Sequence, residues 1–166
     1  MTKIKNICIL GSTGSIGQNS LEVIAHFPDR FSSKYLSTNK NIDLLTKQIE
    51  RVHPKAVAIL DEHAASLMKQ RMNGSVKLFT GEIGLLELLC NEDIDIVINA
   101  LVGFAGMKPT IEAVTNGKTV ALANKESLVV AGEIIISLAQ KRGVDIIPID
   151  SEHSAILQCL AGERHE

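Results

Sequence analysis

Two carboxylates and a histidine lie close together in the stretch Ile147–Leu157 of this 166-residue chain. Asp150 and Glu152 are two positions apart, with Ser151 between them. We expect these two residues to end the last predicted strand. Because residues i and i+2 of a strand point to the same side, both carboxylates are predicted to face one ion. Carboxylate oxygens suit Mg²⁺ or Mn²⁺, and the serine hydroxyl can donate a hydrogen bond to a bound substrate. The alternative interpretation is a helix cap, since Asp and Ser commonly cap helices.

Three glycines, Gly11, Gly14 and Gly17, form the pattern G-x-x-G-x-x-G between a strand-like and a helix-like segment. Glycines at such a turn allow backbone N–H groups to approach a pyrophosphate, and the following helix directs its positive end toward that anion. Thr13 and Ser15 add hydroxyl donors. The motif therefore predicts a nucleotide site, whereas the alternative is a tight turn that binds no ligand.

The residues after the second predicted strand indicate which nucleotide binds. An NAD site usually has an Asp or Glu about 20 residues beyond the glycines, where it holds the ribose 2′-hydroxyl. This chain has Ser37, Thr38, Asn39, Lys40 and Asn41 in that region. A cation with amides suits a 2′-phosphate, which a carboxylate would repel, so the sequence favours NADP. The alternative is a solvated loop.

A further polar segment, Asn124–Ser127, follows a predicted strand and precedes an apolar helix-like segment. Ligands of open α/β sheets bind outside the carboxyl ends of the strands. Lys125 suits an anionic or carbonyl substrate, and Asn124 and Glu126 suit hydrogen bonds to the ribose of the nicotinamide. The same residues also fit a helix cap followed by an acidic first turn.

The elements that must position these residues alternate between short β-branched runs and longer amphipathic segments, which predicts right-handed βαβ units. Almost wholly apolar runs such as DIVINAL belong to a parallel sheet that is covered on both faces. The predicted fold is α/β, a doubly wound, mostly parallel sheet of the Rossmann-like, dinucleotide-binding kind. The predicted strands are 4–10, 33–37, 56–60, 76–79, 94–100, 119–122 and 144–149. The predicted helices are 15–26, 42–51, 62–72, 82–90, 109–116 and 127–141.

Composition argues against several kinds of partner. A hydrophobic content of 45% and a net charge of −2, without a run of Lys or Arg, indicate neither nucleic acid nor a membrane surface as the partner. Cys8, Cys90 and Cys159 are odd in number and far apart, which favours reduced thiols and a cytoplasmic location over a disulfide framework or a zinc site. We find no signal peptide at the N-terminus and no run of about 18 apolar residues.

Taken together, the segments LGSTGSIG, LANKESLVVAG and PIDSEHSAI resemble the 1-deoxy-D-xylulose 5-phosphate reductoisomerase family in their order and spacing. The resemblance extends over essentially the whole chain. It implies an enzyme that uses NADPH and Mg²⁺ or Mn²⁺ to isomerise a phosphorylated ketose and reduce the intermediate aldehyde to 2-C-methyl-D-erythritol 4-phosphate. This reaction is an early step of non-mevalonate isoprenoid biosynthesis. The resemblance also implies a homodimer for the full-length enzyme.

The same resemblance assigns roles to individual residues. The implied NADPH contacts are Thr13, Gly14, Ser15, Ile16, Asn39, Lys40, Asn41, Asn124 and Glu126. The implied substrate contacts are Lys125, Ser151 and Glu152, and the implied metal ligands are Asp150 and Glu152. The catalytic groups would be Lys125, Asp150 and Glu152, with the ion polarising substrate oxygens as a Lewis acid. Many members have glycine where this chain has Asn39, so the chain departs from the family pattern there.

Family members are much longer than this chain. The resemblance therefore implies an NADPH-binding domain at residues 1–149 and the start of a truncated catalytic domain at 150–166. We expect the chain alone to be inactive, and the segment from Ser151 onward to be poorly ordered. Two alternatives remain open. One is another NADP-dependent enzyme, such as a relative of the semialdehyde dehydrogenases, which would need a nucleophilic cysteine that neither Cys8 nor Cys90 supplies. The other is a non-catalytic nucleotide-binding module.

Overall fold

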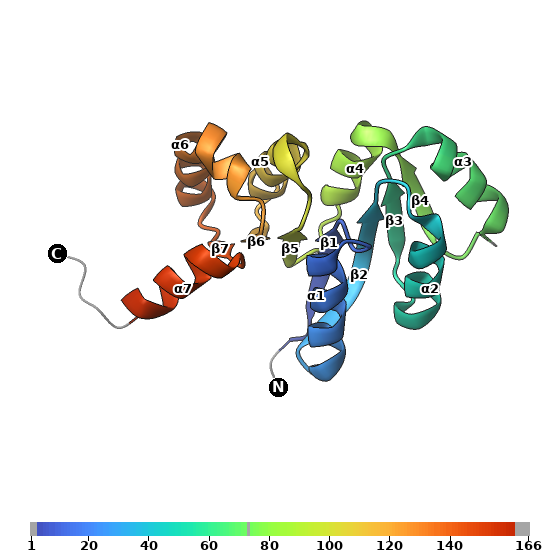
Figure 1. Ribbon diagram of the computed structural model, residues 1–166, viewed down its shortest axis with the longest axis horizontal. Coiled ribbons are helices and arrows are strands. Elements are labelled where there is room, and N and C mark those ends of the chain that lie inside the picture. The colour runs from blue at the N-terminus through green and yellow to red at the C-terminus, as the bar shows by residue number, and fades with distance from the viewer. Residues whose placement is uncertain (1–2, 73, 162–166) are drawn as a thin grey trace.

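The strands lie side by side in one twisted, parallel sheet (Figure 1). The computed structural model describes residues 3–72 and 74–161, and within these ranges the sheet has seven strands in the order β4-β3-β2-β1-β5-β6-β7. Every neighbouring pair in this order is parallel. The strands are β1 (Lys5–Leu10), β2 (Phe31–Thr38), β3 (Ala56–Ile59), β4 (Lys77–Thr80), β5 (Ile96–Asn99), β6 (Thr119–Leu122) and β7 (Ile146–Pro148). The predicted α/β fold is confirmed.

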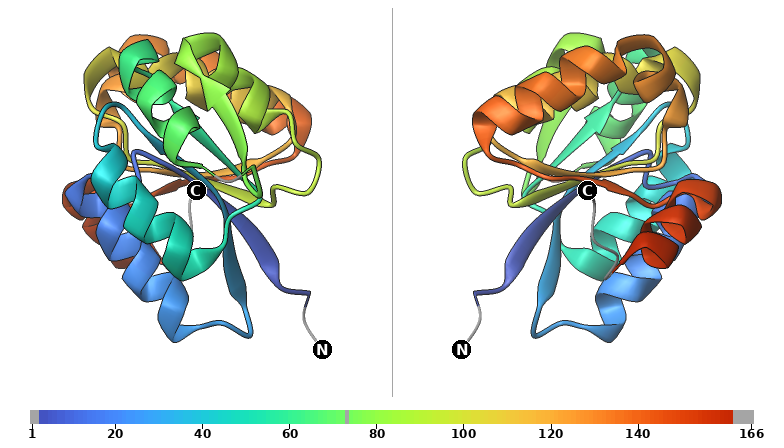
Figure 2. Two further views of the ribbon diagram at one scale, coloured as in Figure 1. Left: turned by 90° about the vertical axis from the view of Figure 1, so that its right-hand side faces the viewer. Right: turned by 90° about the vertical axis from the view of Figure 1, so that its left-hand side faces the viewer.

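Helices pack on both faces of the sheet, as apolar parallel strands require. They are α1 (Ser15–His26), α2 (Ile42–Val52), α3 (Glu62–Arg71), α4 (Gly81–Leu89), the 3₁₀ helix η1 (Gly103–Gly106), α5 (Met107–Thr115), α6 (Lys125–Arg142) and α7 (Ser151–Leu160). Ile7 and Ile9 of β1 pack with α1, α2 and α3, whereas Cys8 and Leu10 pack with α4, α5 and α6. Figure 2 shows α1 on one side of the sheet and α5 and α6 on the other. Among the described residues, no helix is both long and apolar enough to cross a membrane.

Local sequence signals explain where several elements begin and end. Gly117 after α5 and Gly143 after α6 adopt positive φ angles of 72° and 65°, a conformation that glycine reaches without steric cost. The sequence predicted both helix ends. Helix α1 and strand β6 have the predicted bounds, and the other predicted elements differ at their ends by no more than two residues.

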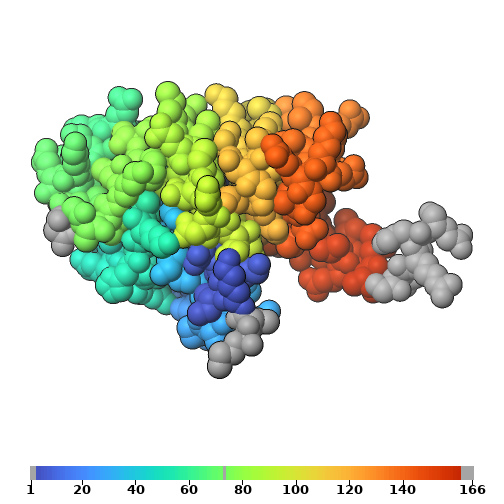
Figure 3. Space-filling view, turned by 180° about the vertical axis from the view of Figure 1, so that it is seen from behind, coloured from blue at the N-terminus to red at the C-terminus, as the bar shows by residue number. Residues whose placement is uncertain are grey.

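Helix α7 corrects one expectation. The segment from Ser151 onward was expected to be poorly ordered, but residues 151–160 form a helix, while residues 162–166 lie outside the part of the chain that the structure describes. None of the residues of α7 is buried, and Figure 3 shows the helix standing off the body of the molecule. A carboxylate cap at Asp150 and strong helix formers such as Leu157 and Gln158 stabilise the helix locally.

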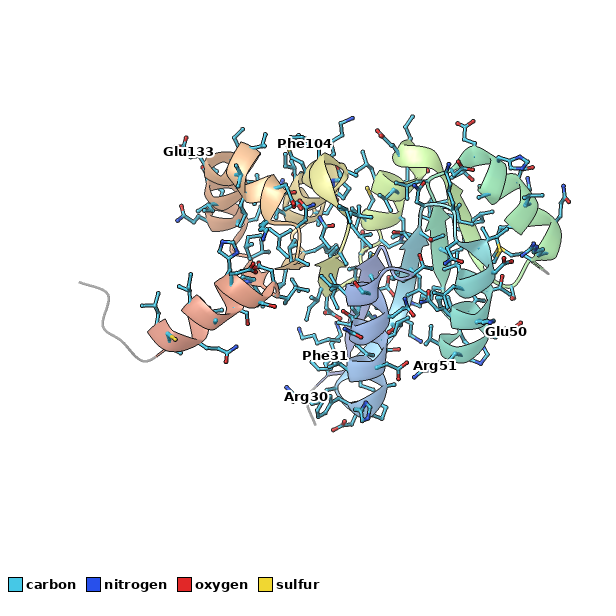
Figure 4. All side chains as sticks on the ribbon, in the orientation of Figure 1. Arg30, Phe31, Glu50, Arg51, Phe104 and Glu133 are labelled. Carbon is cyan, nitrogen blue, oxygen red and sulfur yellow. The ribbon has the colours of Figure 1, made fainter. Side chains whose placement is uncertain are left out.

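One apolar face of the sheet is partly open in the described part of the chain. A groove of about 710 Å³ runs between α1 and the start of α7 over β5, β6 and β7, and Ile98 and Ile147 lie on its floor. Phe31 lines the groove beside α1 (Figure 4), and Ile147 is 40% exposed. Parallel sheets are ordinarily covered on both faces, so this surface stands out as apolar and only partly covered.

Candidate functional site

The predicted site residues follow the carboxyl ends of four parallel strands and therefore lie along one edge of the sheet. They come from the turn after β1, the loop after β2, the start of α6 after β6 and the start of α7 after β7. The strand order reverses direction between β1 and β5, which is where ligands bind in open α/β sheets. This common location follows from the predicted parallel sheet, which is confirmed.

The turn after β1 needs glycine at two positions for reasons internal to the protein. Gly11 has a φ of 78°, and a Cβ there would lie 3.0 Å from the carbonyl oxygen of Ala100. A Cβ on Gly17 would lie 2.3 Å from the carbonyl oxygen of Gly11 and 2.5 Å from Cα of Ser12. Both contacts involve backbone atoms. Gly11 therefore permits the close approach of the loop after β5 to the turn, and Gly17 permits the close packing of α1 against the turn.

Gly14 differs from the other two glycines of the turn. It is exposed, has ordinary extended angles of φ −76° and ψ 170°, and the nearest atom to a Cβ there is the carbonyl oxygen of Gly11 at 3.4 Å. It is the N-cap of α1 and provides no side-chain cap. The first amides of a helix have no partner within that helix, so the N-terminus of α1 presents donors to an anion. Ser15 and Ile16, in this first turn, are exposed beside it.

The side chain of Thr13 is directed toward β2. Its hydroxyl oxygen lies 2.7 Å from that of Thr38, at the end of β2, and either hydroxyl can be the donor. This contact joins the glycine turn to the loop that was predicted to select the nucleotide. The two predicted parts of the cofactor site therefore contact each other.

The loop after β2 holds its cation close to a neighbouring carboxylate. Lys40 is 72% exposed, and its ammonium lies 3.5 Å from the carboxylate of Asp61, the N-cap of α3. The backbone amide of Ala64 lowers the pKa of Asp61, and Lys40 lowers it further. Asn41 caps α2 by accepting a hydrogen bond from the amide of Leu44 at 3.1 Å. Asn39 is exposed, and its carbonyl oxygen accepts from the amide of Asp61 at 3.1 Å, which fixes the loop against β3.

The side chain of Asn124 is buried and serves as the cap of α6. Its Oδ1 accepts from the amide of Ser127 at 3.0 Å and from the hydroxyl of the same serine. Its Nδ2 donates to the carbonyl oxygens of Leu101 and Gly103 at 2.8 and 2.6 Å. A Cβ on Gly106 would lie 2.6 Å from the Asn124 side chain. Asn124 therefore ties the loop after β5 to α6, and its contact with a cofactor stays a prediction.

Lys125 brings together two segments that are far apart in sequence. Its ammonium lies 3.5 Å from the carboxylate of Glu152, and both side chains are exposed. Glu126 is half-buried in the first turn of α6. The predicted substrate contacts from α6 and α7 thus lie side by side.

The predicted geometry of Asp150 and Glu152 was wrong. Strand β7 ends at Pro148, Asp150 is the N-cap of α7, and Glu152 lies in the first turn of that helix. Residues two apart in a helix project about 200° apart around its axis, so the argument from strand alternation does not apply. The Oδ1 atom of Asp150 accepts from the amide and the imidazole of His153 at 3.0 and 2.8 Å. The helix-cap interpretation describes the observed structure.

The chemistry at the start of α7 still suits a cation. The backbone amide of His153 and then its imidazole lower the pKa of Asp150, which keeps this carboxylate ionised. Among the described residues, no group of three or more His, Cys, Asp or Glu side chains is arranged to hold a metal ion. The assignment of Asp150 and Glu152 as metal ligands therefore stays a prediction.

An apolar pocket also lies at this edge of the sheet. It has a volume of about 370 Å³ and lies between α4 and the η1–α5 segment. Leu60, Leu85 and Phe104 line it, and Phe104, which is 71% exposed, projects from η1 (Figure 4). Because Leu60 directly follows β3, the pocket lies at the carboxyl edge of the sheet.

The sequence interpretation named Ser37 but missed the hydrogen-bonded polar cluster to which it belongs, beneath the glycine turn. Ser12, Ser37 and Gln48 are buried and hydrogen-bonded to one another. One signal was available, since Ile42 and Leu45 mark the inner face of α2, and a glutamine three residues further on falls on that face.

Comparison with known proteins gives a consistent result. The family model of 1-deoxy-D-xylulose 5-phosphate reductoisomerase matches residues 7–132. A protein of that name from Chloroherpeton thalassium is 52% identical over 164 residues, which cover 98% of this chain and 42% of that protein. One from Bacteroides fragilis is 46% identical, covering 97% of this chain and 42% of that protein. The chain thus spans about 42% of the length of these curated relatives.

Solved structures agree with the sequence relatives. A DOX-P reductoisomerase in complex with magnesium has a TM-score of 0.90 and 37% identity, with coverage of 95% of this chain and 40% of that one. The reductoisomerase from Zymomonas mobilis in complex with NADPH has a TM-score of 0.88 and 38% identity, covering 95% and 41%. A homoserine dehydrogenase from S. aureus has a TM-score of 0.55 at 21% identity, covers 90% of this chain and 33% of that one, and shows a shared fold alone.

Proposed function

Because the chain belongs to the 1-deoxy-D-xylulose 5-phosphate reductoisomerase family, we propose that it supplies the NADPH-binding part of an enzyme that converts 1-deoxy-D-xylulose 5-phosphate to 2-C-methyl-D-erythritol 4-phosphate. The observation that carries the proposal is the glycine turn. Gly11 and Gly17 are required by packing, whereas Gly14 is open to solvent at the N-terminus of α1. A glycine that the fold does not need, at an anion-binding helix end, supports close approach of a pyrophosphate.

The cofactor contacts follow the edge of the sheet. The turn residues Thr13, Gly14, Ser15 and Ile16 hold the pyrophosphate, and the loop residues Asn39, Lys40 and Asn41 hold the 2′-phosphate. Asn124 and Glu126 lie toward the nicotinamide end. NADPH supplies the hydride for reduction, and the chain's own residues bind and orient it. A solved relative from Zymomonas mobilis contains NADPH, which supports this choice of cofactor.

Substrate and metal are proposed to bind where α6 and α7 begin. Lys125, Ser151 and Glu152 contact the phosphorylated ketose, and Asp150 with Glu152 holds Mg²⁺ or Mn²⁺. The ion supplies Lewis-acid polarisation of substrate oxygens when it is bound. The ionised carboxylate of Asp150 fits such a hard cation, and a relative with NADPH, fosmidomycin and magnesium supports the choice of metal. Residues 1–149 then form the cofactor domain, and 150–166 begin the catalytic part.

The thiols of Cys8 and Cys90 do not suit chemistry of the semialdehyde-dehydrogenase kind, which needs a reactive cysteine. Cys8 lies in β1, fully buried, and burial raises the pKa of its thiol. Cys90 caps the C-terminus of α4, where burial and then the carboxylate of Glu112 raise the pKa of its thiol. Neither thiol is prepared to act as a nucleophile.

Cofactor choice provides the test of this proposal. We expect the chain to bind NADPH more tightly than NADH in calorimetric titrations, because Lys40 attracts the 2′-phosphate and no acid follows β2. Lys40→Glu should weaken NADPH binding roughly 10- to 100-fold, the range for loss of a contact to a charged group, and leave NADH nearly unchanged. Lys141→Glu, in the last turn of α6 at the opposite edge of the sheet, is the charge-matched control.

Two outcomes would count against this assignment of the 2′-phosphate. One is equal affinity of the unmodified chain for the two cofactors. The other is an equal loss of affinity for NADPH and NADH in Lys40→Glu. That result would point to disruption of the loop through Asp61 rather than to lost recognition of the 2′-phosphate.

A further inference from the structure

A small polar cluster is buried directly beneath the glycine turn. Ser12 of the turn and Ser37 of β2 have no exposed surface, and Gln48 of α2 is 6% exposed. Buried polar side chains are costly unless they are hydrogen-bonded, so each needs a partner. Gln48 is more than a filler of this space, because both ends of its amide contact Ser12.

The amide, the carbonyl and the hydroxyl of Ser12 are all hydrogen-bonded. Gln48 Nε2 donates to the Ser12 carbonyl oxygen at 2.8 Å, and the Ser12 hydroxyl donates to Gln48 Oε1 at 2.7 Å. The Ser12 amide donates to the Ser37 carbonyl oxygen at 2.8 Å, and the Gly11 amide donates to the Ser37 hydroxyl at 3.1 Å. Strand β2 and helix α2 therefore fix the orientation of the turn from beneath.

These hydrogen bonds also orient the Ser12–Thr13 peptide on the outer side of the turn, where a ligand would bind. The carbonyl of Ser12 and the N–H of Thr13 belong to one planar trans peptide, so they point in opposite directions. Since the carbonyl points inward to Gln48, the N–H of Thr13 must point outward. The turn is closed just beyond it, where the Gly14 amide donates to the Gly11 carbonyl oxygen at 3.0 Å. An inward hydrogen bond thus sets the direction of an outward donor.

We propose that Gln48 is a positioning residue for cofactor binding: it orients the Ser12–Thr13 peptide so that its N–H faces the cofactor phosphates. The inference rests on the proposed function. Helix α2 also begins at the loop with Lys40 and is capped by Asn41. One rigid helix therefore sets the spacing between the pyrophosphate turn and the 2′-phosphate loop.

The test separates the two ends of the cofactor. Gln48→Met removes both hydrogen bonds at similar volume, and Gln48→Glu keeps an acceptor for Ser12 but loses the donor. Thr46→Val, which removes a side-chain hydrogen bond within the same helix, is the control. Affinities are measured for NADPH and for adenosine 2′-monophosphate, which carries the 2′-phosphate but no pyrophosphate. Thermal unfolding is recorded for every variant.

We expect both Gln48 variants to bind NADPH about tenfold more weakly while their affinity for adenosine 2′-monophosphate stays within about twofold. Unchanged NADPH affinity in a folded variant would overturn the inference. An equal loss of both ligands would also overturn it, because Gln48 would then act on the whole domain. If one variant does not fold, the other decides. Failure of the unmodified chain to bind NADPH would instead overturn the proposed function, and this inference with it.

Discussion

Replacing Gly14 with valine is expected to abolish measurable NADPH binding while the chain keeps its fold. The backbone at this position has extended angles that any residue adopts, and a Cβ would meet its nearest neighbour at 3.4 Å. The added side chain would therefore occupy the space outside the first turn of α1, where the pyrophosphate is proposed to lie. The fold should lose only about 1 kcal/mol, because valine is a poorer N-cap than glycine.

Gly17→Ala is the contrasting variant, since it adds a methyl group where the protein itself leaves no room. Its Cβ would lie 2.3 Å from one backbone atom of the turn and 2.5 Å from another. We expect a marked fall in melting temperature, because the turn or α1 must shift. Circular dichroism on heating, together with calorimetric titration of NADPH, distinguishes a variant that has lost its ligand from one that has lost its fold.

The size series at position 14 sharpens this comparison. Gly14→Ala should weaken NADPH binding less than Gly14→Val, because a methyl group fills less of the space above the helix end. A folded Gly14→Val chain with unchanged affinity for NADPH would show that the glycine serves the turn alone. The nucleotide interpretation of the motif would then lose its main support.

The fold was predictable because its signals are local. Strands such as Ala56–Ile59 are apolar on both faces, and Gly117 and Gly143 mark the ends of helices where positive φ angles are needed. The bounds of α1 were predicted correctly, since a glycine turn and an amphipathic segment define them together. Because the strands were predicted to be parallel and in one sheet, their carboxyl ends had to lie at one edge. The site residues follow those ends, so they were expected at that edge.

The detailed site was less predictable because it depends on contacts between distant residues. Asp150 was assigned to a strand because the apolar run before it continues to Ile149, yet β7 stops at Pro148, and the following Asp-Ser-Glu sequence caps a helix. Gln48 contacts Ser12 across 36 positions, which no local pattern reveals. At Asn124 the sequence allowed both a cap and a ligand contact, and only the fold shows its amide bonded to the loop after β5.

The 166-residue chain by itself is expected not to oxidise NADPH in the presence of 1-deoxy-D-xylulose 5-phosphate and Mn²⁺. The described residues provide no arrangement of three metal-binding side chains, Asp150 Oδ1 already accepts two hydrogen bonds, and Glu152 is paired with Lys125. Mg²⁺ demands near-octahedral coordination and gives up water reluctantly, so two separated carboxylates should bind it weakly. Absorbance at the NADPH band and a calorimetric metal titration measure both properties.

A chimera tests whether the same residues act once the site is extended. The chain is joined to the part of the Chloroherpeton thalassium relative that lies beyond its match, which leaves the proposed cofactor domain unchanged. We expect substrate-dependent and metal-dependent oxidation of NADPH. Asp150→Asn in the chimera should lower kcat roughly 100-fold or more, because the proposed ion loses a charged ligand while the amide oxygen still caps α7. Asp145→Asn, an exposed acid before β7, is the matched control.

The combination of outcomes identifies which part of the proposal fails. Turnover by the 166-residue chain, or micromolar metal affinity that Asp150→Asn removes, would show that the start of α7 is already a complete site. An inactive chimera that still binds NADPH would retain the cofactor assignment and reject the catalytic one. Full activity in the Asp150→Asn chimera would mean that Asp150 serves only as the cap it forms with His153, and that the ion is held by other residues.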